Sequence, residues 1–207
     1  MAAFPRTLPP ATVTYPQNIG SLISVGQSGG LQTRSQNAQG LVWEETWPVL
    51  KAGNEDVQEL LVTIQNLYNT GATCTLTHYL LPGSGKARMG TGNGTPVVDG
   101  ASQSGTTLVT DGWDASEGVL KAGDCFTIAG LSVLFRATAD VTSASSSSAD
   151  TSISITPPIV AGSSPANDAA ITTTGCTITA VILDYDAASA GPDEFIAGMK
   201  VTFQEAP

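Results

Sequence analysis

The stretch VLKAGDCFTIAGLSVLFRATAD, Val119 to Asp140, decides the fold class of this chain. It contains two runs rich in β-branched and aromatic residues, and the turn sequence Lys-Ala-Gly-Asp at 121–124 precedes the first of them. Similar runs continue on both sides, so we expect strands over 106–110, 125–129, 133–140 and 151–156. Short strands at this spacing are typical of a small β-barrel. The serine-rich tract 142–150 has little to bury and is expected to form an exposed hairpin tip.

Before the barrel, residues 54–71 predict an α-helix. Asn54 is a good N-cap, and acidic side chains at Glu55 and Asp56 suit the positive end of the helix dipole. Gly71 suits the left-handed conformation that ends a helix. The apolar residues recur with helical spacing and predict one buried face: Val57, Leu60, Leu61, Ile64, Leu67 and Tyr68.

Further strands are expected on both sides of this region. In segment 41–49, alternation places Trp43 and Trp47 on one face of a strand and directs Glu44 and Glu45 to opposite faces. The other expected strands cover 22–25, 31–35, 73–80, 176–185 and 194–205. The sequence therefore predicts a mainly β fold with one principal α-helix, in which a small β-barrel is inserted into a split β-sheet-plus-helix domain.

Three segments are expected to lack regular structure. Residues 1–20 contain four prolines, which forbid a helix and favour an extended arm that is either loose or laid across a neighbour. The glycine-rich segment 82–96 is expected to be a flexible connector. A second linker is expected after Pro157 and Pro158, around residues 162–165.

The composition narrows the range of functions. Charged residues make up 13% of the chain, the net charge is −10, and Ser and Thr occupy 45 positions. So few basic residues argue against nucleic acid or anionic lipid as the main ligand. The three cysteines are widely spaced and fit buried thiols in a reducing compartment. The first residues contain no continuous apolar run, and we expect a soluble product without a membrane-spanning segment, made in the cytoplasm.

The motifs that suggest catalysis are weak. His78 is the one histidine, and a core position fits its alternating segment better than a catalytic role. Gly83-Ser-Gly-Lys86 lacks the full phosphate-loop spacing, and Ala87 replaces the hydroxyl that would hold magnesium. The acidic residues at 184–186 and 193–194 fit a solvated turn better than a calcium loop. We therefore expect no enzyme activity, no cofactor and no metal site.

A series of short motifs resembles the tail-tip structural proteins of long-tailed bacteriophages, of the distal tail or baseplate hub type. The resemblance lies in the order and spacing of the set, which covers most of the chain. The motifs are VWEETWP (42–48), DVQELL (56–61), LLPGSG (80–85), GTPVVDGASQ (94–103), TLVTDGW (107–113), VLKAGD (119–124), TADVTS (138–143) and ITPPI (155–159).

This resemblance implies a virion protein that forms a hexameric ring at the end of the tail tube. A belt domain, residues 1–92 and 166–207, would form the ring, and an inserted barrel, residues 93–165, would be peripheral. The implied partners are further copies of the chain, the tail tube protein, and the tail-tip hub or fibre proteins, with DNA passing through the channel unbound. The family's common extra domain follows the belt, whereas here it lies inside it. The role of the barrel therefore stays open between receptor carbohydrate, other tip proteins and decoration.

Two sets of contact residues follow from these considerations. The candidate subunit contacts are Phe4, Tyr15, Trp43 and Trp47, since an extended arm can lie along a neighbour's sheet edge. The candidate peripheral contacts are Gln103, Asp111, Trp113 and Asp114, in which Trp113 would stack on a sugar. For Trp113 a core position is the competing interpretation. Two alternative functions stay open, a capsid decoration or head-tail joining protein and a carbohydrate-binding tail module.

Overall fold

The computed structural model describes residues 2–15, 17–18, 21–25, 31–35, 41–47, 50–51, 53–186, 195–196 and 198–206. These residues are mainly β and include one α-helix, which confirms the prediction of a mainly β fold with one principal helix. They form two compact units: unit 1 comprises Met1–Thr75 and Thr179–Pro207, and unit 2 comprises Leu76–Ile178. No described helix has the length and apolar character needed to cross a membrane.

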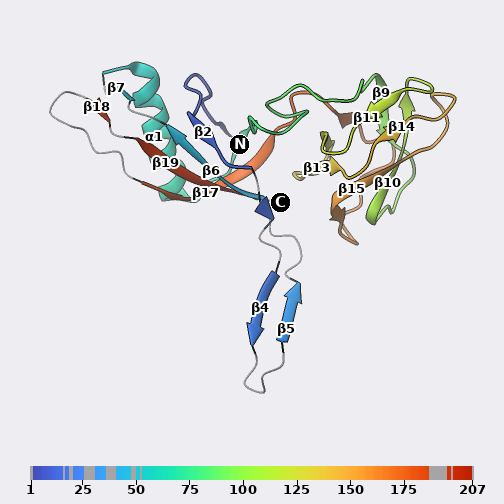
Figure 1. Ribbon diagram of the computed structural model, residues 1–207, viewed down its shortest axis with the longest axis horizontal. Helices are drawn as coiled ribbons and strands as arrows, with labels where there is room; N and C mark the ends of the chain where they lie inside the picture. The colour runs from blue at the N-terminus through green and yellow to red at the C-terminus, as the bar shows by residue number, and fades with distance from the viewer. Residues whose placement is uncertain are drawn as a thin grey trace. The chain divides into compact units, whose positions relative to one another are not determined.

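Unit 1 is built on a seven-stranded sheet with the order β1-β8-β17-β19-β6-β2, in which β3 also pairs with β6. Its centre consists of three long antiparallel strands, β17, β19 and β6, which lie side by side in Figure 1. In β6 every second residue is buried, and Trp43 and Trp47 share the buried face as predicted. The strands are β1 (Ala2–Ala3), β2 (Thr12–Val13), β3 (Gln17–Asn18), β6 (Leu41–Trp47), β8 (Cys74–Leu76), β17 (Ile178–Tyr185) and β19 (Met199–Glu205).

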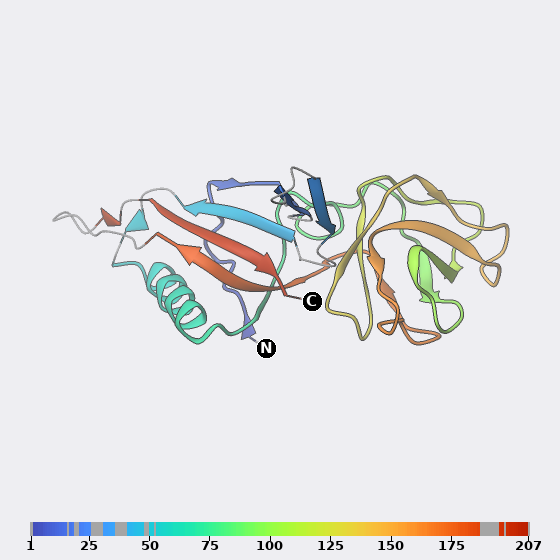
Figure 2. The same cartoon turned by 90° about the horizontal axis from the view of Figure 1, so that it is seen from below.

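The helix α1 (Glu55–Thr70) lies against one face of this sheet (Figure 2). The Asn54 side chain accepts a hydrogen bond from the Asp56 N–H at 2.9 Å, and Gly71 ends the helix with φ 63°. Four of the predicted apolar positions are buried, Val57, Leu60, Ile64 and Leu67. The ring of Tyr68 remains 41% exposed and packs edge-on against Tyr185 of β17. The predicted helix and both its ends are confirmed.

Two small sheets complete the described part of unit 1. The strands β4 (Ser21–Val25) and β5 (Leu31–Ser35) pair as an antiparallel hairpin, and β7 (Leu50–Lys51) pairs with β18 (Phe195–Ile196). The predicted strands at 22–25 and 31–35 are confirmed. Pro16, Val49 and the predicted acidic turn at 193–194 lie outside the described residues.

Unit 2 contains a six-stranded, nearly closed, barrel-like sheet with the order β16-β12-β13-β15-β10-β9. Backbone hydrogen bonds from Val98 N to Ala169 O (3.0 Å) and from Asp168 N to Val98 O (2.9 Å) join β9 to the residues before β16. A further pair, β11 and β14, lies outside this order. The strands are β9 (Gly94–Val98), β10 (Gly105–Trp113), β11 (Gly118–Leu120), β12 (Cys125–Ile128), β13 (Leu134–Ala137), β14 (Val141–Thr142), β15 (Thr151–Ile159) and β16 (Ile171–Thr172).

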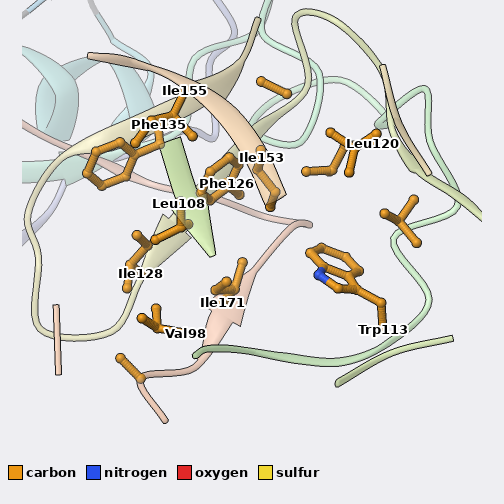
Figure 3. Packing of buried hydrophobic residues seen from close by; sticks show 14 of the residues in the cluster. Val98, Leu108, Trp113, Leu120, Phe126, Ile128, Phe135, Ile153, Ile155 and Ile171 are labelled. Atoms are coloured by element: carbon orange, nitrogen blue, oxygen red, sulfur yellow. The ribbon is translucent and has the colours of Figure 1, made fainter. Parts of the chain in front are cut away.

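The barrel strands enclose one hydrophobic core, which Figure 3 shows from close by. Every strand of the sheet contributes an apolar side chain to it, because alternate residues of each strand point inward. Within this core the rings of Phe126 and Phe135 stack with 5.9 Å between their centroids. The labelled core residues are Val98, Leu108, Trp113, Leu120, Phe126, Ile128, Phe135, Ile153, Ile155 and Ile171.

The prediction of a flexible connector is wrong for residues 82–92. We call these residues the strap. Its glycines permit close packing: a Cβ on Gly83 would lie 2.3 Å from Cys125 O, and one on Gly90 would lie 2.3 Å from Val119 O. The buried Asp124 carboxylate holds the strap by accepting hydrogen bonds from Met89 N (2.7 Å) and Gly90 N (2.8 Å). The sequence pattern did not distinguish glycines needed for contact from glycines that give flexibility.

Two other expectations needed correction. The strand expected over 73–80 ends at Leu76, and the chain then turns back so that Gly85 N and Leu81 N both donate to His78 O. The strand expected over 151–156 continues through Pro157 and Pro158 to the end of β15. The pairing of β15 with β10 is irregular there, so the missing N–H groups of the prolines remove no regular ladder bonds.

Candidate functional site

The N-terminal arm, residues 2–14, crosses the sheet of unit 1 from one edge to the other. At one edge Ala2 and Ala3 pair in parallel with β8, and at the other edge Thr12 and Val13 pair with β6. Backbone bonds from Phe4 N to Thr75 O and from Thr14 N to Glu44 O, each 2.9 Å, extend these two pairings. The arm is therefore bound to the sheet at both ends.

An aromatic contact holds the first half of the arm. The ring of Phe4 meets the ring of Phe203 edge-on, with 5.3 Å between the centroids. Trp43 lies opposite Phe203 in the neighbouring strand and stacks on it at 5.4 Å. All three side chains are at least nine-tenths buried. Burying rings of this size is among the larger stabilising terms available to a small sheet.

A buried ion pair holds the middle of the arm. The guanidinium of Arg6 donates to both carboxylate oxygens of Glu45, at 2.5 and 2.9 Å, and the Glu45 side chain is fully buried. The indole Nε1 of Trp43 donates to the same carboxylate at 3.1 Å. Further along the arm, Leu8 O accepts a hydrogen bond from Trp47 Nε1 at 3.0 Å. Glu45, Trp47 and Phe203 contact the arm, and Trp43 packs on Phe203 and bonds to Glu45. We call these four residues the arm groove.

The Cys74 thiol lies beside this ion pair. Burial raises its pKa to about 11, and the positive charge of Arg6 offsets part of that increase. The thiol donates to Ala180 O at 3.6 Å. Cys74 is therefore a buried, protonated side chain, as is expected for a thiol with a packing role.

The structure brings together three of the four candidate subunit contacts. Phe4, Trp43 and Trp47 lie at the arm groove and are buried; Phe4 contacts Phe203, and Trp47 bonds to Leu8 of the chain's own arm. Tyr15 follows the arm and is 52% exposed. Sequence reasoning missed Arg6 and Glu45. The signal for Glu45 was its inward position between two tryptophans in an alternating strand.

The four candidate peripheral contacts lie in unit 2 and do not form one exposed surface. The ring of Trp113 is 1% exposed, and its Nε1 donates to Thr110 Oγ1 at 2.8 Å. Thr110 Oγ1 in turn donates to Thr151 O at 2.8 Å. In this arrangement the indole presents no exposed face to a sugar, so the structure favours the core interpretation of Trp113.

Gln103 fastens the loop that joins β9 to β10. Its amide nitrogen donates to Asp99 O at 2.6 Å and Val109 O at 2.9 Å, and its amide oxygen accepts from Val109 N at 2.7 Å. These bonds occupy the amide with the chain's own backbone. Asp114, by contrast, is exposed.

Carboxylates gather beside this loop. The pKa of Asp99 is raised, first by a side-chain hydrogen bond with Asp150, then by partial desolvation and by the negative charges of Asp150, Asp111 and Asp168. Within the described ranges, no set of three or more His, Cys, Asp or Glu side chains is arranged to hold a metal ion. The local electrostatics are therefore those of mutually repelling acids.

His78 and Ser84 are both buried and bind backbone groups. Ser84 Oγ accepts from His78 N and donates to Cys176 O, each at 2.8 Å. His78 Nδ1 accepts from Leu80 N at 3.2 Å. Because the Ser84 hydroxyl donates its proton to the backbone carbonyl of Cys176, the Ser84 side chain binds the strap to that residue. The Ser84 hydroxyl is not arranged here as a nucleophile activated by the imidazole.

No family model matches this chain, and no curated protein sequence is significantly similar to it.

Proposed function

We propose that this chain is a structural virion protein that forms a closed ring at the distal end of a bacteriophage tail tube. In this proposal unit 1 is the belt that builds the ring, and unit 2 is a peripheral domain inserted into it. The ring joins the tube to the tail-tip hub or fibre proteins and leaves a channel for DNA. The motif series described above supports the assignment to the tail tip.

The observation that carries the proposal is that two segments far apart in sequence together form unit 1. Both ends of the chain contribute to one sheet, and the whole of unit 2 lies between them in sequence. A sheet built in this way supports a second domain without giving up its own strand pairing. That property suits a ring whose subunits each carry a peripheral domain.

The charge of the chain also supports a passage for DNA. With eight basic against eighteen acidic residues, the net charge is −10, and a ring of such subunits repels phosphate. DNA that is repelled from the wall passes without sticking. The proposal therefore includes no specific DNA site and no enzymatic step.

The mass of the purified protein in solution, measured by multi-angle light scattering, tests this proposal. A species of about six times the 21.1 kDa chain mass is the expected result. Trimers would point instead to a capsid decoration protein. Monomers that also fail to bind purified tails, compared side by side with empty heads, would contradict the proposal.

A further inference from the structure

Unit 2 is joined to the sheet of unit 1 through two neighbouring strands. The chain enters unit 2 after β8 and returns to the sheet in β17, and these strands are adjacent in the sheet order. Across this pair the Cys74 thiol donates to Ala180 O at 3.6 Å. Residues 77–177 lie between the two strands in sequence, and bringing the ends of so long a segment together costs chain entropy. A group that holds these ends close would therefore stabilise the pairing of the two strands.

We propose that the side chain of Ser84 is a clasp that closes the two ends of unit 2 and so keeps β8 and β17 aligned. Ser84 Oγ accepts a hydrogen bond from His78 N, two residues after β8, and donates one to Cys176 O, two residues before β17. Both bonds are 2.8 Å long. One hydroxyl thus joins the outgoing chain to the returning chain. The clasp acts within a single copy, whether or not copies form a ring.

The groups of the clasp are shielded from water. His78, Ser84 and Cys176 are all buried. Hydrogen bonds at such positions meet little competition from solvent, and a buried N–H or C=O that loses its partner destabilises the fold. Replacing the hydroxyl by hydrogen takes one partner from His78 N and one from Cys176 O. The Ser84 side chain therefore stabilises both ends of unit 2 at once.

The glycines on either side of Ser84 complete the closure. Cys176 N donates to Gly83 O at 2.9 Å, and Gly85 N donates to His78 O at 2.9 Å. Together with the two bonds of the Ser84 hydroxyl, these contacts bind the N–H and the C=O of both end residues. A Cβ on Gly85 would lie 2.6 Å from His78 O, so a side chain there would obstruct the approach. The Gly-Ser-Gly sequence at 83–85 thus serves chain closure.

The clasp is also attached to the barrel, at the first residue of β12. Cys125 N donates to Pro82 O at 2.8 Å, and the thiol of Cys176 donates to Cys125 O at 3.6 Å. A Cβ on Gly83 would lie 2.3 Å from the same carbonyl oxygen, so the two backbones are in close contact. Folding of the barrel therefore sets the distance between the ends of unit 2. The clasp passes that constraint on to β8 and β17.

Hydrogen–deuterium exchange of the native chain and of Ser84→Ala tests the clasp. We expect the amides of Cys74–Leu76 and of residues 178–180 to exchange about tenfold faster or more in Ser84→Ala, because two buried hydrogen bonds that align their strands are lost. The amides of β10 are the internal reference, and their rates should change by a smaller factor. Rates in β8 and β17 that change no more than those in β10 would overturn the proposal.

Ser143→Ala is the matched control. Ser143 is a buried serine of unit 2 whose hydroxyl also accepts from one backbone N–H, that of Glu117 at 2.9 Å, and donates to one carbonyl, that of Asp114 at 2.5 Å. It binds neither end of unit 2, so we expect its loss to leave the relative rates of β8 and β10 unchanged. A selective acceleration in β8 and β17 as large as that of Ser84→Ala would refute a specific role for Ser84.

If Ser84→Ala fails to fold, exchange in the native chain decides. Residue-resolved exchange measured by NMR at increasing urea gives the opening free energy of each amide and its urea dependence. We expect the amides of His78, Cys176 and Cys74–Leu76 to share both values, because the clasp and the strand open as one unit. Amides of Cys74–Leu76 that open at lower urea than those of His78 and Cys176 would overturn the proposal.

Discussion

Glu44 and Glu45 are neighbours in β6, yet they form ion pairs on opposite faces of the sheet. Glu45 is fully buried and binds Arg6 of the arm. Glu44 is partly exposed and binds Lys200 of β19 at 2.6 Å, a contact that raises the pKa of Lys200. Only the buried pair involves the arm. The exposed pair between Glu44 and Lys200 therefore serves as a reference for how much the contact between Arg6 and Glu45 stabilises unit 1.

Removing the cation of the buried pair should destabilise unit 1. We expect Arg6→Met to lower the free energy of unfolding by about 3–5 kcal/mol, because it leaves a buried carboxylate without its cation. Lys200→Met removes the cation of the exposed pair, and we expect little measurable change, since water screens that pair. Urea denaturation of both variants measures the difference. Equal effects of the two substitutions would contradict the structural role of the arm.

The strap should be sensitive to a single added methyl group. Gly90→Ala places a Cβ 2.3 Å from Val119 O and 2.6 Å from Leu120 Cα, so the backbone must shift. We expect a loss of about 1–3 kcal/mol or more in the free energy of unfolding. Gly118→Ala is the matched control, because its Cβ would meet no atom within 4 Å. A Gly90→Ala protein as stable as the control would mean that the strap does not pack as described.

Local features of the fold could be predicted from the sequence. The Asn54 cap, the Gly71 end and the helix between them depend on neighbouring residues, and alternation alone placed Trp43 and Trp47 on one face. Long-range features could not be predicted. The strand expected over 73–80 ends at Leu76 because the chain turns there, and the backbone N–H groups of Leu81 and Gly85 donate to His78 O.

The candidate site shows the same limit. Alternation predicted that Glu44 and Glu45 point to opposite faces and places Glu45 on the face of the two tryptophans, but it did not indicate which cation would pair with a buried Glu45. The partner of Glu45 lies 39 residues earlier, in an arm whose prolines indicated only extended structure. Likewise, Trp113 had two interpretations, and the structure favours the core position because the side chain is buried and its indole nitrogen donates to Thr110.

Trp113 should matter for the stability of the barrel. We expect Trp113→Ala to lower the free energy of unfolding of unit 2 by about 3–5 kcal/mol, because it empties a buried, aromatic-sized volume. Trp113→Phe keeps most of that volume and should cost less. Thermal unfolding followed by circular dichroism measures both variants. A stable Trp113→Ala protein that loses binding on a glycan array would instead support a carbohydrate site.

The carboxylates near β10 should make stability depend on pH. Because the pKa of Asp99 is raised in the folded state, the folded protein binds its proton more tightly than the unfolded chain does. The contribution of Asp99 to stability is therefore greatest below its ordinary pKa of 3.8, and it is lost as the pH rises through the raised value. Asp150→Asn removes one negative charge, so we expect the pKa of Asp99 to fall.

Carboxyl chemical shifts measured by NMR over a pH series report the pKa of Asp99 directly. Asp114→Asn removes an exposed acid that is not among the charges acting on Asp99, and it is the matched control. A pKa of Asp99 that stays unchanged in Asp150→Asn would contradict the contact between the two carboxyl groups.

The proposed ring is tested most directly by negative-stain electron microscopy of the purified protein, with class averages examined for rotational symmetry. The account predicts sixfold averages with an open centre and peripheral density at the rim. Threefold particles, or compact particles without a central opening, would contradict the assignment of this chain to the end of a tail tube.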